Sequence, residues 1–265
     1  MNYNIEELIG LVKEASLEVL MPYFNEVERS YKADGSVVTR ADHQMQAFIQ
    51  EKLKKLYPDS LLLGEEMSAD EQADILQSGQ SVWCLDPLDG TNNFTVGIPY
   101  FSISLALIEQ GKVVLGIVYD PVRDECFYAT EDQQSKLNGE RLIINTTDLM
   151  LKQSIAIIDF KRLSKQMATR LVSDIPYSSQ RSFGSVALDW CWLAAGRGHI
   201  YLHGRSNIWD YAAGQFIFTK AGGYSCTLER EPVFTDRLEP RSAVAAVDKN
   251  LFDAWLGWLM SATGE

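Results

Sequence analysis

The sequence has few histidines, no paired cysteine motif and no long uninterrupted apolar run. Only three of its 265 residues are histidine and four are cysteine. The cysteines show no CxxC or Cys/His spacing of the kind found in zinc and redox sites, so we interpret them as reduced core thiols of a cytoplasmic protein. No apolar stretch is long enough to span a bilayer. Charged residues interrupt the N-terminal apolar pattern, which is unlike a signal peptide. These absences predict a globular intracellular protein.

Positive charge is also scarce. Lysine and arginine together number 24 against 36 aspartates and glutamates, which gives a net charge of −12, spread along the chain. This balance disfavours nucleic acid or an anionic membrane as the main partner. A small anionic substrate is compatible with it only if bound cations make the substrate site locally positive.

Hydrophobic periodicity predicts helices and then consecutive strands in the first half of the chain. Helices are expected over 4–20 and from Thr39 to Pro58, with a hairpin-like loop over 31–39 between them. Strands are expected at 61–63, 101–107, 113–119 and 125–129, and the polar residues 67–80 are expected to be irregular. Consecutive strands favour an antiparallel sheet covered by the two helices.

The second half of the chain alternates strands with helices, the pattern of an α/β arrangement. Strands are expected at 155–158, 200–202 and 243–247. Helices are expected at 161–172, 186–195 and 210–221, and a final helix follows from Leu251 onward. We place a boundary near residue 146, which predicts domains 1–145 and 146–265 that pack tightly together.

One stretch, WCLDPLDGTNNF at 83–94, combines several features of a functional site. An apolar strand ends in Asp86 and Asp89, which Pro87 can bend toward one point. Carboxylate oxygens suit Mg²⁺ better than Zn²⁺. The backbone N–H groups of Gly90 and Thr91 are candidates to hold a phosphate. The alternative interpretation is an ordinary Asp-Pro-x-Asp-Gly turn with solvated acids.

Two further segments also end apolar runs with acids. Glu65 follows the strand at 61–63 in Gly-Glu-Glu, and Asp210 follows Trp209 in WDYAAG at 209–214. Taken alone, Asp210 could be a helix cap or a first-turn acid. The combination of all three segments is far more specific than any one of them.

With GEE at 64–66, DPLDGTNNF at 86–94 and WDYAAG at 209–214, the chain resembles the inositol monophosphatase family of Mg²⁺-dependent, Li⁺-sensitive phosphatases over nearly its whole length. The resemblance implies the α+β class, as a layered α/β/α/β/α sandwich. It also implies bound Mg²⁺, a small phosphorylated substrate and a homodimer.

The same resemblance implies roles for individual residues. The implied metal ligands are Glu65, the Leu88 carbonyl and the acids Asp86, Asp89 and Asp210. Thr91 would hydrogen-bond the attacking water, with Glu65 as its catalytic partner and Asp42 orienting Thr91; Asp42 could equally be a helix cap. Lys32 would be a lysine near the metals or an ordinary exposed lysine.

The expected substrate contacts are Gly90, Thr91, Gly184 and Ser185, with His203 at a position where the family usually places an acid. His203, with Arg205 nearby, could favour a second anionic group or a different alcohol, or could be a plain polar residue at a strand end.

We therefore expect Mg²⁺-dependent hydrolysis of an inositol-1-phosphate-like monoester. Alternatives with the same chemistry are a sugar bisphosphate, histidinol phosphate or a 3′-phosphonucleotide as substrate. A haloacid-dehalogenase-type enzyme with Asp86 as nucleophile is a weaker alternative, because its two acids should be separated by one residue rather than two. A regulatory scaffold that retains the fold is the alternative outside enzymes.

Overall fold

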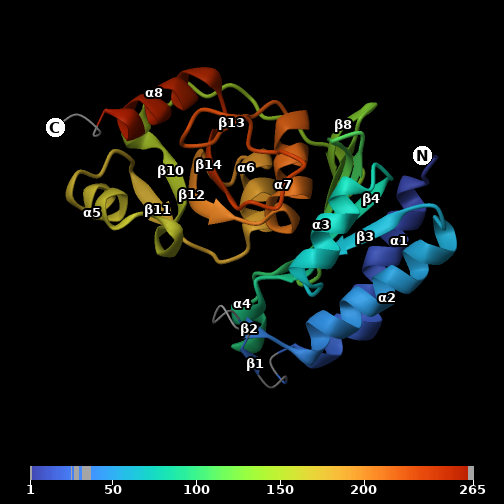
Figure 1. Cartoon of the computed structure of the whole chain (residues 1–265). Coiled ribbons are helices and arrows are strands. Elements are labelled where there is room, and N and C mark those ends of the chain that lie inside the picture. Colours follow the sequence, from blue (N-terminus) through green and yellow to red (C-terminus); the bar gives the residue numbers. More distant parts are fainter. Residues whose placement is uncertain (1, 25, 27–29, 32–36, 262–265) are drawn as a thin grey trace.

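The computed structural model of the chain describes residues 2–24, 26, 30–31 and 37–261, and two β-sheets organise it into layers (Figure 1). The larger sheet has seven strands in the order β3-β4-β5-β6-β7-β8-β9, and the smaller has five in the order β11-β10-β12-β14-β13. The first sheet comprises β3 (Leu61–Gly64), β4 (Val82–Asp89), β5 (Ser102–Glu109), β6 (Lys112–Asp120), β7 (Glu125–Thr130), β8 (Gln133–Leu137) and β9 (Glu140–Arg141). The second comprises β10 (Ile155–Asp159), β11 (Ser179–Arg181), β12 (Ile200–Ser206), β13 (Tyr224–Cys226) and β14 (Arg241–Ala246), and a separate pair joins β1 (Ser30–Tyr31) to β2 (Val37–Val38).

Two N-terminal helices form the outermost layer against the seven-stranded sheet. The chain is α-helical in α1 (Ile5–Ala15) and continues as a π-helix over Ser16–Leu20, so the helix predicted over 4–20 changes geometry after its third turn. The second helix, α2 (Arg40–Leu56), begins at a capping box on Thr39. Alternate residues of β4 such as Trp83 and Leu85 pack with the buried faces of both helices, because successive side chains of a strand point to opposite faces.

The expectation that 67–80 is irregular was wrong. This segment contains α3 (Ala69–Gln77), and its start is a capping box between Ser68 and Glu71. The Ser-x-x-Glu spacing that encodes the box was present in the sequence. Gln72 is buried and donates from Nε2 to the Gly64 carbonyl at 2.9 Å, which ties α3 to the end of β3. The polar composition reflects a short helix that is otherwise largely exposed.

Two helices, α6 (Val186–Ala194) and α7 (Ile208–Lys220), form the central layer between the sheets (Figure 1). Small residues allow their close approach. A Cβ added at Gly214 of α7 would lie 2.9 Å from the Ala187 carbonyl of α6, and one added at Gly116 of β6 would lie 2.9 Å from the Ala213 carbonyl. The Ala-Ala-Gly run of WDYAAG is therefore a packing surface, and α7 is held directly against the seven-stranded sheet.

The last layer, α5 (Lys165–Ser173) and α8 (Lys249–Met260), covers the other face of the five-stranded sheet. The helix predicted at 161–172 starts late, because Phe160–Arg162 forms a 3-10 turn and Ser164 caps α5. Within this sheet β10 is parallel to β11 and β12, whereas β14 is antiparallel to β12. The five layers confirm the predicted α/β/α/β/α fold of the α+β class.

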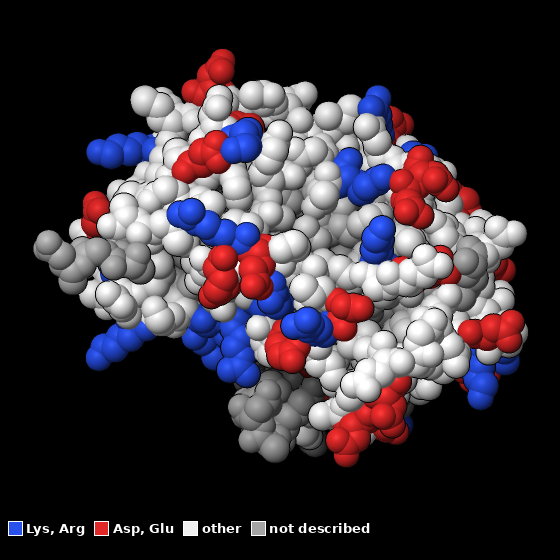
Figure 2. All heavy atoms as spheres, turned by 45° about the horizontal axis from the view of Figure 1, so that its top comes forward, with Lys and Arg blue, Asp and Glu red and all other residues white. Residues whose placement is uncertain are grey.

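The seven-stranded sheet ends at Arg141 and the five-stranded sheet begins at Ile155, but α6 and α7 pack on both. The division into domains 1–145 and 146–265 therefore stays a prediction. Within the described ranges, no helix is both long and apolar enough to cross a membrane. Figure 2 shows acidic and basic side chains interspersed over the face it presents.

Candidate active site

The first acids of the site lie where two parallel strands end. β3 pairs in parallel with β4, and the Glu65 backbone N–H donates to the Leu85 carbonyl at 3.2 Å, so Glu65 follows β3 beside Asp86. The pairing of β4 with β5 shifts register between Asp86 and Asp89, which is the bend that Pro87 was expected to introduce. Asp86 is only 2% exposed and Asp89 only 7% exposed. Two buried acids at one strand end need polar partners.

Each of these aspartates uses one oxygen for hydrogen bonds within the protein. Leu88 N–H donates to Asp86 Oδ1 at 3.0 Å. Ser185 Oγ and the Ala187 N–H donate to Asp89 Oδ2 at 2.7 and 2.6 Å. Ser185, predicted as a substrate contact, therefore contacts Asp89 at the start of α6, and it links the two halves of the chain at this point.

Asp210 arrives from the other half of the chain, in the first turn of α7. Its Oδ2 accepts from the Asn207 N–H at 2.8 Å in a capping box. Ser104, the register partner of Asp86 on β5, donates from Oγ to the Trp209 carbonyl at 3.1 Å. This bond fixes the start of α7 beside the end of β4, so Asp86 and Asp210 face one region.

Burial and mutual repulsion raise the pKa values of these acids. The pKa of Asp86 is raised well above its usual range by burial, and further by the charges of Glu65, Asp89 and Asp210. Burial, with the charges of Asp89 and Glu65, raises the pKa of Asp210 in the same way. Burial raises the pKa of Asp89 to about 6, although its hydrogen bonds from Ser185 and Ala187 oppose the rise. Such a group of acids is stabilised by a cation among them.

The donor chemistry of the site fits a hard divalent ion. Every candidate ligand is an oxygen, from Glu65, Asp86, Asp89, Asp210 and the Leu88 carbonyl, and each hydrogen-bonded aspartate has a second oxygen to offer. Across the part of the chain that the structure describes, however, no three His, Cys, Asp or Glu side chains lie close enough together to form a complete ligand group. The acids therefore line a common region without closing into a ligand shell.

Thr91 and Asp42, which the sequence analysis paired, lie in contact. Thr91 Oγ1 is 3.2 Å from Asp42 Oδ1 and 3.0 Å from the Leu88 carbonyl, and it can donate to either. Asp42 Oδ2 accepts from the Thr39 N–H at 2.8 Å and from Thr39 Oγ1 at 2.6 Å. Burial raises the pKa of Asp42, and these Thr39 hydrogen bonds oppose the rise. Asp42 thus both completes the capping box of α2 and contacts Thr91.

Two glycines with positive φ, Gly90 and Gly184 (φ of +90°), allow the backbone to fold closely around this region. Gly90 has φ of +100° just before the short helix α4 (Thr91–Thr95), and an added Cβ would lie 3.1 Å from the Tyr100 carbonyl and 3.2 Å from the Gly184 carbonyl. Asn93, which the sequence reasoning gave no role, donates from Nδ2 to the Tyr100 and Phe183 carbonyls at 2.8 and 2.7 Å. Asn93 thereby holds the 184–185 segment beside Gly90.

His203 lies on β12 and is 2% exposed. Its Nδ1 accepts from the Arg205 N–H at 3.3 Å, and its Nε2 lies 3.2 Å from Asp159 Oδ2. Asp159, a residue that no sequence motif singled out, ends β10 directly opposite His203 in the parallel pairing. The substrate-binding role of His203 stays a prediction, and Lys32 lies outside the described residues.

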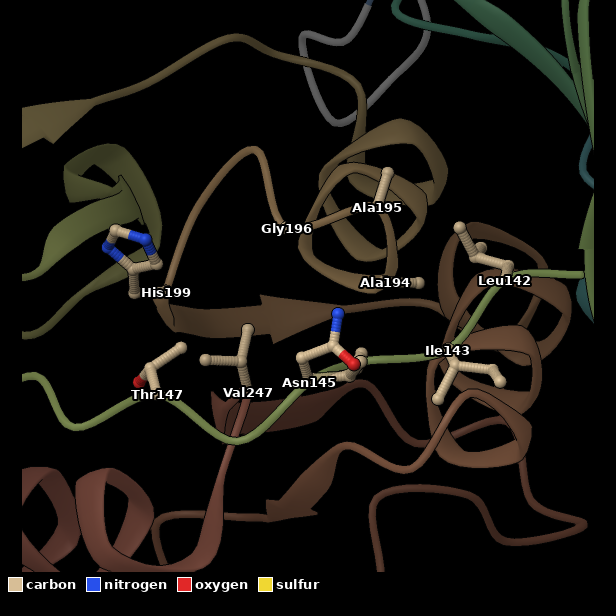
Figure 3. A pocket seen from close by; sticks show the side chains of 10 residues that line it. Leu142, Ile143, Asn145, Thr147, Ala194, Ala195, Gly196, His199 and Val247 are labelled. Atoms are coloured by element: carbon tan, nitrogen blue, oxygen red, sulfur yellow. The ribbon is translucent and has the colours of Figure 1, made fainter.

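A surface pocket of about 200 Å³ has none of the acids described above in its lining (Figure 3). Its lining includes His199, which precedes β12, and Ala194 and Gly196 at the end of α6. The acids instead face the start of α6 and the far end of β12. The nine-residue helix α6 separates the two places by roughly 13 Å, at about 1.5 Å per residue. The pocket is therefore no part of the acid site.

Together, the five layers and the acids after β3, at the end of β4 and in the first turn of α7 define a layered α+β protein with an acid-lined region. The profile of the inositol monophosphatase family matches residues 3–256, and the chain belongs to this family. The family resemblance drawn from the three motifs is thus confirmed. The family is generally metal-dependent, with Mg²⁺ as the typical ion.

Some relatives of the chain are named as phosphatases and others as Nus factors. The chain is 34% identical over 216 residues to a fructose-1,6-bisphosphatase/inositol-1-monophosphatase of Thermotoga maritima, covering 77% of each chain. It is 36% identical over 208 residues to a Nus factor SuhB of Pasteurella multocida, covering 76% of each. Among solved structures, inositol monophosphatase II of Staphylococcus aureus superimposes with a TM-score of 0.79 at 28% identity, covering 97% of this chain and 96% of that one.

Proposed function

We propose that the protein hydrolyses a small phosphate monoester, of the inositol 1-phosphate kind, with Mg²⁺ as cofactor. The observation that carries the proposal is the convergence of Asp86, Asp89 and Asp210, from two halves of the chain, on one region beside Thr91. Phosphatase names among the relatives support it.

In this proposal Glu65, Asp86, Asp89, Asp210 and the Leu88 carbonyl would hold the metal. When bound, Mg²⁺ supplies charge that offsets the phosphate and lowers the pKa of a bound water. The carboxylate hydrogen bonds described above keep the acids oriented toward that region before any ligand arrives.

The chain's own residues then position the reactants. With Asp42 accepting its proton, the Thr91 hydroxyl presents a lone pair that can accept a hydrogen bond from the attacking water, and Glu65 would take a proton from that water. The N–H groups of Gly90 and Thr91 would hold phosphate oxygens as the chain turns into α4. No covalent phosphoenzyme at Asp86 is needed, because the nucleophile is water.

Phosphate release from a panel of monoesters tests the proposal. Inositol 1-phosphate, fructose 1,6-bisphosphate, histidinol phosphate, a 3′-phosphonucleotide and 2′-AMP, which a Staphylococcus aureus relative is reported to bind, make up the panel. We expect turnover that EDTA abolishes and that Asp89→Asn reduces at least about a hundredfold. Turnover that persists in EDTA, or an Asp89→Asn variant as active as the native protein, would contradict it. We also expect Li⁺ inhibition, and light scattering at twice the chain mass for the proposed homodimer.

The Nus factor names of several relatives favour a second candidate, a regulatory role that depends on the fold rather than on catalysis. Complementation separates the two. A deletion strain rescued equally by native protein and by Asp89→Asn would support the regulatory role, and rescue by native protein alone would support the phosphatase.

A further inference from the structure

One hydrogen-bonded aspartate–histidine pair beside the acid site has no part in the mechanism above. Asp159 is the last residue of β10, and it pairs in register with His203, which lies within β12 where the parallel pairing of the two strands ends. The carboxyl ends of parallel strands are where α/β sheets bind their ligands. The pair thus stands in a position typical of substrate contacts.

Within the pair, the carboxylate rather than the imidazole meets solvent. The side chain of His203 is 3% exposed and that of Asp159 is 29% exposed. Since His203 Nδ1 accepts from the Arg205 N–H, its proton lies on Nε2 and is donated to Asp159 Oδ2. Both ring nitrogens of His203 are therefore engaged in hydrogen bonds. A substrate that reaches the carboxyl end of β10 would meet the carboxylate of Asp159.

Asp159 is fixed and ready to accept further hydrogen bonds. Its Oδ1 accepts from the Lys161 N–H at 2.9 Å, and its Oδ2 is held by His203. Burial works to raise its pKa, but the hydrogen bonds from His203 and the Lys161 N–H, with the charge of Arg162, hold that pKa below the ordinary value, which keeps the group ionised. A carboxylate has about four acceptor positions, and the two named bonds leave room for a donor from a ligand.

Electrostatic effects connect the pair with the acid site. The charge of Arg162 acts on both places: it helps to lower the pKa of Asp159, and it opposes the rise that burial causes in the pKa of Asp210. The backbone places Arg162 close to β12, because a Cβ added at Gly204 would lie 2.0 Å from the Arg162 carbonyl. A phosphate held near Asp89 and Asp210 would leave its alcohol group within reach of this edge.

We propose that Asp159 determines substrate specificity by accepting a hydrogen bond from a hydroxyl of the alcohol, with His203 as the residue that positions it. The substrate class is then a polyhydroxylated phosphate monoester rather than one with a second anionic group at this edge. The proposal rests on the proposed phosphatase function, and it moves the recognition role expected of His203 to its partner.

Steady-state kinetics with two substrates test the assignment. Inositol 1-phosphate offers ring hydroxyls, and p-nitrophenyl phosphate offers none. We expect Asp159→Asn to raise KM for inositol 1-phosphate on the order of 10- to 100-fold with kcat nearly unchanged, the result of losing a hydrogen bond to a charged acceptor. Both constants for p-nitrophenyl phosphate should stay the same. Asp174→Asn, at an exposed position after α5, is the matched control.

Variants of His203 test whether this residue positions Asp159 for the substrate or only stabilises the fold. His203→Ala should raise the same KM, and its effect should not add to that of Asp159→Asn, because both remove one interaction. His203→Gln, which keeps an amide donor toward Asp159, should recover part of the loss. A structural role alone would change both substrates equally, and that result would overturn the proposal.

Calorimetry of ligand binding to the native protein and to Asp159→Asn tests the recognition role without depending on turnover. If native protein turns over neither substrate, the phosphatase function fails. Weaker binding of inositol 1-phosphate to Asp159→Asn, with unchanged binding of inorganic phosphate, would still support the recognition role. Equal binding of inositol 1-phosphate by native protein and Asp159→Asn, or no binding to either, would overturn it.

Discussion

Asp89 offers a sharp physical test of the acid site, because its burial should destabilise the metal-free protein. The raised pKa of Asp89, about 6 against an ordinary 3.8, means that the folded state binds a proton more tightly than the unfolded state. This tighter proton binding stabilises the folded state fully below about pH 4, where Asp89 is protonated. The stabilisation is lost as the pH rises through about 6 and the buried carboxyl group becomes ionised. At 1.36 kcal/mol per pH unit, the loss is at most about 3 kcal/mol.

Asp89→Asn removes this dependence while keeping the shape of the site. The amide oxygen of asparagine can still accept from Ser185 Oγ and the Ala187 N–H. In EDTA near pH 7.5 we therefore expect the variant to be about 1–3 kcal/mol more stable than the native protein, and the gap to shrink near pH 5. A gain of 1 kcal/mol raises Tm by roughly 2–4 °C in a chain of this size.

Denaturant unfolding in EDTA and in Mg²⁺ measures both effects. Saturating Mg²⁺ should reverse the order, because an ion at about 1,000 times its Kd stabilises the native protein by about 4.1 kcal/mol and should bind the variant weakly. Asp174→Asn should change neither curve. The reasoning fails if Asp89→Asn is less stable than native protein in EDTA at both pH values, or if Mg²⁺ stabilises the two equally.

Three further predictions concern the surroundings of this acid. Thr91→Ala should lower kcat about a hundredfold or more with little change in Tm, whereas Thr91→Ser should keep most of the activity; equal losses would remove the role of the hydroxyl. Gly204→Ala should destabilise the protein by about 1–3 kcal/mol in denaturant unfolding, because its Cβ would collide with the Arg162 carbonyl, and an unchanged midpoint would contradict this packing. Asn93→Ala should raise KM for phosphate esters by releasing the Phe183 carbonyl, whereas an unchanged KM would show that the 184–185 segment needs no such clamp.

Local patterns in the sequence predicted much of the fold. The residues of β4, β5 and β6 alternate between two cores, and the period of two is visible in the sequence for β5, whereas β4 and β6 are recognisable as apolar runs. The strands at or next to the sheet edges, β8, β9, β11 and β13, were not predicted, because they are short and polar or mixed in composition and pair only where a neighbouring strand offers an edge. Helix α3 was missed although its capping box was present, because its polar composition was given more weight.

The site was predictable to the extent that its residues belong to local motifs. Asp86, Asp89 and Asp210 each end an apolar run, so the sequence alone indicates them. Asp159 and Asn93 act through the tertiary arrangement: Asp159 faces His203 only because β10 lies beside β12, and Asn93 reaches Phe183 across 90 positions of the chain. A single sequence holds no signal for such pairings.

The two interpretations of Asp42 and Asp210, helix cap or site residue, turn out to be one arrangement. Each is the third residue of its helix, and each gives one oxygen to the backbone N–H of the cap residue, Thr39 or Asn207. That bond fixes the rotation of the carboxylate, so the other oxygen points in a defined direction, toward Thr91 in the case of Asp42. Loss of the cap alone costs about 1 kcal/mol. Asp42→Asn, which keeps an acceptor for the cap, should therefore unfold near the native Tm while losing turnover, and a loss of stability without a loss of turnover would show that capping is its whole role.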